Sequence, residues 1–146
     1  MSAQATTAAR VGDHPGRWRG VRAPLVLAAA GGATAVALLV RSPHLPGSYG
    51  FCPFLALTGA YCPGCGGLRA VHDVLGGDLA GAWAMNPLVV VVLPVLVGLW
   101  ARWAWRGWRG RPVAPPGTAA IVGLAVVLAV FTVARNLPAL APVLAP

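Results

Sequence analysis

Three cysteines are the residues of this chain whose types and spacing can carry chemistry. Cys52 is followed by Cys62 and Cys65, which lie in a CPGCG turn. In such a turn both thiols point the same way, and the glycine after the second cysteine permits a tight bend of the backbone. Zinc takes four ligands, commonly thiolates with or without an imidazole. The sequence therefore predicts a zinc-like metal site with Cys52, Cys62, Cys65 and His72 as its ligands.

The same spacing supports a redox alternative. In an oxidising compartment Cys62 and Cys65 can form a reversible disulfide, with Cys52 as the resolving thiol. These two cysteines are the only catalytic candidates. The glycines around Cys65 are poor helix formers, so we expect the cysteines in a turn and not at a helix start, where thiols become reactive. A structural disulfide with one cysteine left over, or three inert buried thiols, are the remaining alternatives.

Short helices are expected after the cysteine turn. In the first, over 68–75, Arg69 and Asp73 are spaced i, i+4 and can form a salt bridge on one face. Alternatively, Arg69 supports the site by lying near an anion or a thiolate at membrane depth. Gly76 and the next glycine break this helix, and Asp78 is expected to cap a second one that ends near residue 85.

The elements that must position these residues are apolar. Hydrophobic residues make up 58% of the chain and charged residues 10%, whereas soluble domains carry roughly 25% charge. Three runs, 24–40, 87–105 and 118–135, are long enough to cross a bilayer as helices. Asn86 and Pro87 supply the cap and the first position of the second run. The composition therefore predicts an all-α integral membrane protein with three transmembrane helices.

The segment 41–86 is then a cysteine-rich outer loop with short interfacial helices, and 51–60 is a possible fourth, re-entrant segment. Residues 1–23 are expected to be a disordered basic cytoplasmic tail, 106–117 a cytoplasmic loop and 136–146 a proline-rich tail. A cleavable signal peptide is the alternative for the first run, but the long tail before it favours an uncleaved anchor.

Arginine counts predict the orientation. Eight arginines lie on the side of the N-terminus and three on the other side, which places the N-terminus in the cytoplasm and the chain in the cell membrane. The eight are Arg10, Arg17, Arg19, Arg22, Arg102, Arg106, Arg109 and Arg111, and the three are Arg41, Arg69 and Arg135. Because the arginines flank apolar runs, they indicate a lipid bilayer as the partner and exclude nucleic acid, which needs a basic face on a soluble module.

These motifs resemble those of a family of small bacterial membrane proteins, the domain of unknown function 2752 family. The matching positions are Cys52, the run Cys62-Pro63-Gly64-Cys65-Gly66-Gly67-Leu68-Arg69, Gly77-Asp78, Asn86-Pro87 and, near the end, Arg135-Asn136. The resemblance implies a multi-pass membrane protein whose working residues are the cysteines and Arg69. Leu68 stands where many members have threonine, and His72 lies outside the pattern.

The predicted function is that of an accessory or scaffold subunit stabilised by a zinc-like site, which associates with other membrane subunits or with itself. A membrane thiol–disulfide oxidoreductase is the first alternative, and a component of a transporter or channel is the second. The sequence contains no Ser/His/Asp set, phosphate-binding loop or dinucleotide-binding fingerprint, so no other enzyme class is predicted.

Overall fold

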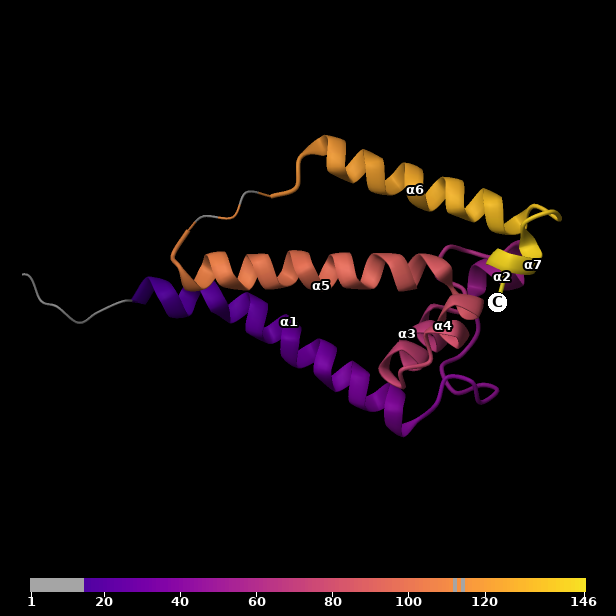
Figure 1. Ribbon diagram of the computed structural model, residues 1–146, viewed down its shortest axis with the longest axis horizontal. Coiled ribbons are helices and arrows are strands. Elements are labelled where there is room, and N and C mark those ends of the chain that lie inside the picture. The colour runs from indigo at the N-terminus through magenta and orange to yellow at the C-terminus, as the bar shows by residue number, and fades with distance from the viewer. Residues whose placement is uncertain (1–14, 112, 114) are drawn as a thin grey trace, which may run out of the picture.

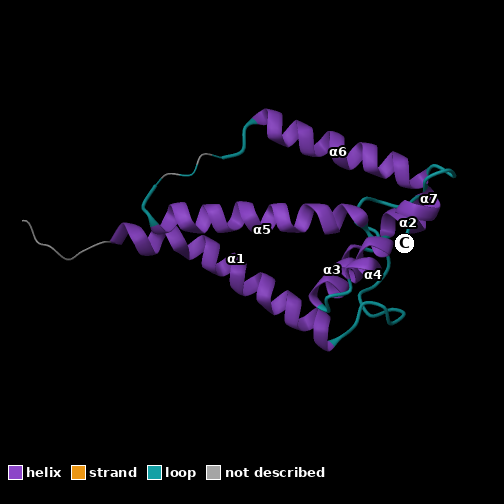
Figure 2. Cartoon of the chain, in the orientation of Figure 1, coloured by secondary structure: helices purple, strands orange, loops and turns teal. Residues whose placement is uncertain are grey.

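A computed structural model describes residues 15–111, 113 and 115–146 (Figure 1), and all the regular structure in this part of the chain is helical (Figure 2). The all-α class is therefore confirmed. The helices are α1 (Pro15–Val40), α2 (Pro53–Thr58), α3 (Gly67–Leu75), α4 (Leu79–Met85), α5 (Pro87–Trp108), α6 (Thr118–Asn136) and α7 (Ala141–Leu144).

Three of these helices are long and apolar enough to cross a membrane. The candidate spans are Gly20–Val40, Pro87–Trp108 and Thr118–Arg135, with mean hydropathies of 2.1, 1.9 and 2.1. Large apolar side chains on all three helices are more than half exposed, for example Val26 and Val133. Such surfaces are stable in contact with lipid and not with water. The three predicted spans are thus confirmed as candidates by length and composition.

The first span begins earlier than the sequence indicated. Residues 15–23, expected in a disordered tail, form the first turns of α1, while residues 1–14 lie outside the described part of the chain. Pro24, the first residue of the predicted run 24–40, lies inside the helix. A proline within a helix removes only its own N–H bond to the carbonyl four residues earlier, which here is the Gly20 carbonyl.

That carbonyl lies against another helix. A Cβ atom built on Gly20 would lie 2.7 Å from the Gly107 carbonyl oxygen, and a Cβ atom on Gly107 would clash with the Gly20 carbonyl oxygen. Small residues allow the backbones of membrane helices to approach this closely. Trp100 Nε1 donates to the Pro24 carbonyl at 3.0 Å beside the crossing. The start of α1 is therefore fixed to the end of α5 (Figure 1).

From this crossing α1 and α5 diverge, and the cysteine segment fills the opening between them. Helices α3 and α4 pack on each other and on α5, and α3 also packs on α1 (Figure 1). Ala70 and Ala82 are fully buried where these short helices meet their neighbours. In the segment after the first span, α3 and α4 therefore pack against the long helices, and this part is not an extended loop.

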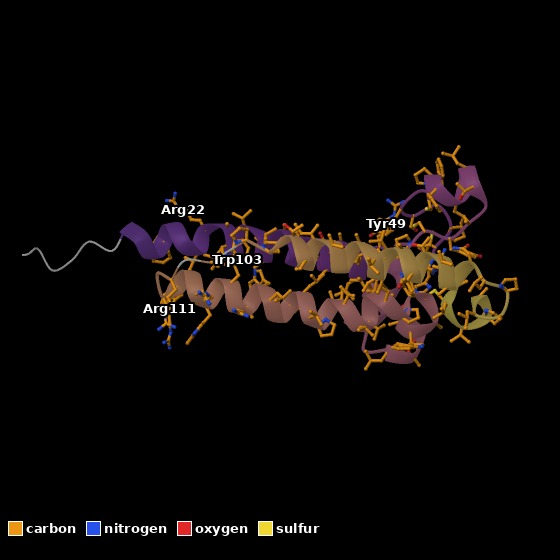
Figure 3. All side chains as sticks on the ribbon, turned by 90° about the horizontal axis from the view of Figure 1, so that it is seen from above. Arg22, Tyr49, Trp103 and Arg111 are labelled. Carbon is orange, nitrogen blue, oxygen red and sulfur yellow. The ribbon has the colours of Figure 1, made fainter. Side chains whose placement is uncertain are left out.

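Helix α6 lies on the other side of α5 in Figure 1 and ends beside the cysteine segment. The tail 136–146, expected to contain no helix, includes the single turn α7, which packs on α4 and α6. Figure 3 shows the two ends of the molecule, with Arg22, Trp103 and Arg111 at one end and Tyr49 at the other. Arg22 in α1 and Arg111 after α5 therefore lie at the end opposite to Tyr49, which lines the same cavity as Cys52 and Cys65.

Candidate metal centre

The three cysteines predicted as ligands come together at the end of the molecule opposite the α1–α5 crossing. The Sγ atoms of Cys62 and Cys65 are 3.2 Å apart, and those of Cys52 and Cys62 are 3.5 Å apart. All three Sγ atoms lie within 4.8 Å of one another, and all three thiols are free. Thiolates bound tetrahedrally to zinc at 2.3 Å lie about 3.8 Å from each other, so small movements suffice to hold an ion.

Local backbone structure sets these positions. Cys52 is the N-cap of α2, and Pro53 follows at the first helical position. The Cys65 N–H donates to the Cys62 carbonyl at 3.1 Å, which closes the cysteine turn. Gly66 then caps α3 with a φ of +76°, a left-handed conformation that favours glycine. A Cβ atom there would also clash with the Met85 carbonyl. The glycine after the second cysteine is therefore required by conformation and by space.

Asn86 ties this turn to the start of α5. Its Nδ2 donates to the carbonyls of Pro63 and Cys65, both at 3.0 Å, and its Oδ1 accepts the Val89 N–H at 3.2 Å. The side chain is fully buried. The last of these bonds is the N-cap that the sequence predicts, with Pro87 next in the helix. The two others were not expected, and they make Asn86 part of the site as well as a cap.

Arg135, at the end of α6, holds the same turn from the other side. Its Nη1 donates to the Cys62 carbonyl at 2.7 Å and its Nη2 to the Cys65 carbonyl at 3.2 Å. The guanidinium also lies over the rings of Tyr61 and Phe131, 5.7 and 5.0 Å from their centroids. The residue has no exposed surface, and its Nε has no hydrogen-bond partner in the part of the chain that the structure describes.

Asn136, the residue after Arg135, adds hydrogen bonds to Tyr61, the residue before the cysteine turn. Its Oδ1 accepts the Tyr61 N–H at 2.8 Å, and its Nδ2 donates to the Tyr61 carbonyl at 2.9 Å. Its Nδ2 also donates to the Thr132 carbonyl inside α6. The end of the third span is thus bonded to the residue that precedes the cysteine turn.

The environments of Cys65 and Cys52 shift the pKa values of these two thiols in opposite directions. Burial, followed by the hydrogen bonds with Cys62 and Cys52, raises the pKa of the Cys65 thiol to about 12. The Leu55 backbone N–H and the thiols of Cys65 and Cys62 lower the pKa of Cys52. Without a metal, Cys65 therefore stays protonated at neutral pH, and Cys52 ionises more readily than a free cysteine.

His72, the fourth ligand expected from the sequence, does not join the cysteines. Its Nδ1 lies 3.1 Å from Asp73 Oδ1, and His44 Nε2 lies 2.7 Å from the same oxygen. These three residues form a separate cluster. The salt bridge expected between Arg69 and Asp73 is also absent from the described residues. Arg69 Nε instead donates to the Pro43 carbonyl at 3.3 Å. Both expectations are corrected, because the segment after α1 returns to α3 and takes over these partners.

The site borders a cavity of about 540 Å³. Cys52 and Cys65 lie in its wall together with Arg69 and Tyr49. Arg69, expected to support the site, is therefore in the same cavity as two of the thiols, although its hydrogen bond is to a loop carbonyl.

Sequence reasoning missed Arg135 and Asn136 as site residues. Arg135 was counted only as a flanking charge, and the pair was otherwise noted only in the family pattern. A usable signal was present, because an arginine directly after seventeen uncharged residues lies near membrane depth, where charged residues need partners. The caps predicted at Asp78 and Asn86 have the expected geometry, with Asp78 Oδ1 accepting the Gly81 N–H at 2.8 Å.

Comparison with protein families gives a match to the segment that contains the cysteines. Residues 52–100 match the family described as Protein of unknown function (DUF2752), which confirms over this segment the resemblance noted from the motifs. The matched segment contains the three cysteines, Arg69 and Asn86, whereas Arg135 lies outside it. Comparison with curated proteins and with solved structures gives no match.

The conformation of Gly66 predicts the effect of adding one methyl group. Gly66→Ala should destabilise the fold by at least about 2 kcal/mol, since the left-handed region costs about 1–2 kcal/mol and the Cβ meets the Met85 carbonyl. Gly64→Ala is the control, because its Cβ would make only ordinary contact with Cys62 Sγ at 3.8 Å. Thermal unfolding in detergent measures both, and equal midpoints for the two variants would contradict the assignment.

Exchanging the amide of Asn86 tests its two unexpected hydrogen bonds. Asn86→Asp keeps the acceptor for Val89 but places an oxygen 3.0 Å from two carbonyls, so we expect a loss of about 2 kcal/mol or more. Asp78→Asn replaces a carboxylate by an amide at the cap of α4, where Asp78 Oδ1 accepts the Gly81 N–H. This variant should leave the free energy of unfolding nearly unchanged. The same unfolding assay checks both, and an equally neutral Asn86→Asp would show that the turn does not depend on this amide.

Proposed function

We propose that this protein is a membrane scaffold subunit whose cysteine turn is stabilised by a zinc-like ion bound to Cys52, Cys62 and Cys65. The observation that carries the proposal is Arg135, which is buried against the cysteine turn. Among residues 15–111, 113 and 115–146 it forms no ion pair with a carboxylate; the acidic partner in both ion pairs there is Asp73, bound to histidines. A buried cation without a counter-charge is costly.

Ionised thiols supply that counter-charge. Three thiolates around one divalent ion carry a net charge of minus one, which a single guanidinium balances. Cys65 and Cys62 are among the ionisable groups that interact with the charge of Arg135. Since metal ligands must be deprotonated, a bound ion would ionise Cys65 despite its raised pKa. The charge of Arg135 and the thiol set thus fit each other when the ion is bound.

The proposed role is structural. An ion held by the three cysteines would link the start of α2 to the cysteine turn, which is bonded through Asn86 to α5 and through Arg135 to α6. Structural zinc sites contribute folding free energy directly. The ion would therefore fix the ends of helices that are held together there mainly by polar contacts. Three of the four zinc positions would be filled by cysteine, and water or another donor atom would supply the fourth.

A thiol–disulfide oxidoreductase is the competing proposal, and the proximity of the sulfur atoms permits it. In the exchange, the Cys52 thiolate would attack Cys62 of a Cys62–Cys65 disulfide, form the Cys52–Cys62 bond and release the Cys65 thiolate. A thiol leaves more slowly as its pKa rises, and the Cys65 pKa is about 12. The leaving group in this direction is thus a poor one, which favours the structural metal site.

Metal content tests the scaffold proposal. Protein purified in detergent should contain zinc, and Cys52→Ser and Cys65→Ser should each remove one equivalent by elemental analysis. Arg135→Met should weaken binding at least about tenfold, since groups that support metal ligands typically contribute that much. Gly64→Ala should keep the metal. A metal-free wild type with a reversible Cys62–Cys65 disulfide in cells, found by thiol trapping, would instead establish the redox proposal.

We also propose that the chain lies in the cell membrane with its N-terminus in the cytoplasm and the cysteines on the outer side. The excess of arginines at the end formed by the start of α1 and the end of α5 supports this orientation. Cysteine labelling tests it, because Leu45 and Val113 lie at opposite ends of the molecule and are both exposed. A membrane-impermeant maleimide should label Leu45→Cys in intact cells and Val113→Cys only after permeabilisation. The opposite pattern would reverse the orientation.

A further inference from the structure

We propose that His44, His72 and Asp73 form a second metal site, which binds a divalent transition-metal ion such as zinc independently of the cysteines. His44 lies in the loop that follows α1, and the two other residues lie side by side in α3. One ligand atom of each residue lies within 4.8 Å of the two others. The set of two imidazoles and one carboxylate is a combination that binds zinc and leaves a position open.

The donor atoms converge on one point. His44 Nε2 is 2.7 Å and His72 Nδ1 is 3.1 Å from the same atom, Asp73 Oδ1. A carboxylate has two oxygens and can accept two donors separately, so convergence on one oxygen is not needed to satisfy Asp73. Ligand atoms around a tetrahedral zinc at 2.0–2.1 Å lie about 3.3 Å apart. The observed spacing is therefore close to that of a bound set.

The carboxylate of Asp73 contacts the two histidines and not Arg69. His44 Nε2 and His72 Nδ1 both contact Asp73 Oδ1. The cation spaced to pair with Asp73 along α3 is Arg69, whose Nε donates to the Pro43 carbonyl. Asp73 thus faces two imidazoles and, among the described residues, is not paired with Arg69.

An ion can reach this cluster from solvent. The side chain of His44 is 42% exposed, that of His72 is 24% exposed, and that of Asp73 is 10% exposed. The imidazole rings meet edge to face, with centroids 5.4 Å apart. Each imidazole can move its proton to its other nitrogen, which frees the nitrogen that faces Asp73 for a metal. Binding therefore requires no large movement of the backbone.

Metal at this cluster would fix one wall of the cavity beside the cysteines. The loop that carries His44 contributes Pro43, Leu45 and the run 47–50 to that wall, and α3 contributes Arg69. An ion shared by His44 and α3 would cross-link the two. The second site would thereby set the shape of the cavity that reaches Cys52 and Cys65.

Cobalt(II) titration of the full chain in detergent tests the proposal, because cobalt bound to thiolates has charge-transfer absorption that cobalt bound to nitrogen and oxygen lacks. We expect two binding events. Cys52→Ser should remove the event with thiolate absorption, whereas His44→Gln and His72→Asn should weaken the other at least about tenfold. In these two variants the thiolate absorption should stay unchanged, which separates this site from the cysteine site.

The choice of variants excludes a merely structural role. Gln and Asn keep an N–H donor for Asp73, so a hydrogen-bonded cluster would survive in both, as circular dichroism and the unfolding midpoint in metal-free buffer would show. His14→Gln removes the third histidine and should leave both binding events intact. A single binding event in the wild type, or a second event that persists in His44→Gln and His72→Asn or disappears in His14→Gln, would overturn the proposal.

Discussion

The backbone carbonyls of residues 61–65 all accept hydrogen bonds, and the rest of the structure depends on the groups that donate them. Asn136 bonds to residue 61, Arg135 to residues 62 and 65, and Asn86 to residues 63 and 65. The Gly67 N–H completes the set at residue 64. Because buried carbonyls without partners are costly, this turn can be buried only where the ends of α5 and α6 meet it. The turn therefore fixes the positions of those two helices.

The burial of polar and apolar side chains is the reverse of that in a soluble protein. The largest fully buried side chains include Arg135 and Asn86, while most leucines and valines of the spans are exposed. In lipid there is no hydrophobic force between helices, so polar contacts and close approaches of small residues hold them together. The Gly20–Gly107 crossing does this at one end of the molecule, and the cysteine turn does it at the other. The chain is joined at its two ends, with apolar surface between them.

The two proposed metal sites differ in the charge that supports them. One cavity is lined by Cys52 and Cys65 and by Pro43 and Leu45, the neighbours of His44. In these proposals Arg135 would compensate the excess charge of three thiolates, whereas Asp73 would supply the negative charge beside His44 and His72. Arg69 lies in the cavity wall with its Nε bonded to the loop after α1. The family resemblance emphasised Arg69, and the structure adds a second arginine with closer contacts to the cysteine turn. Cys52, Cys65, residues of this loop and Pro146 all line the cavity.

The sequence by itself determined the local features of this protein. Apolar runs bounded by arginine and proline predicted three spans, the CPGCG spacing predicted a cluster of thiols, and the residue types at Asp78 and Asn86 predicted caps, because each depends on neighbours within a few positions. The predicted start of α1 at Pro24 is wrong, because the helix continues through Pro24 to the crossing of Gly20 with Gly107, a contact that no local pattern records. Tertiary structure alone decided that Arg135 reaches residues 62 and 65 and that His44 reaches Asp73. These partners are separated by between 29 and 73 positions, and no periodicity or spacing in a single sequence records which distant segments pack together.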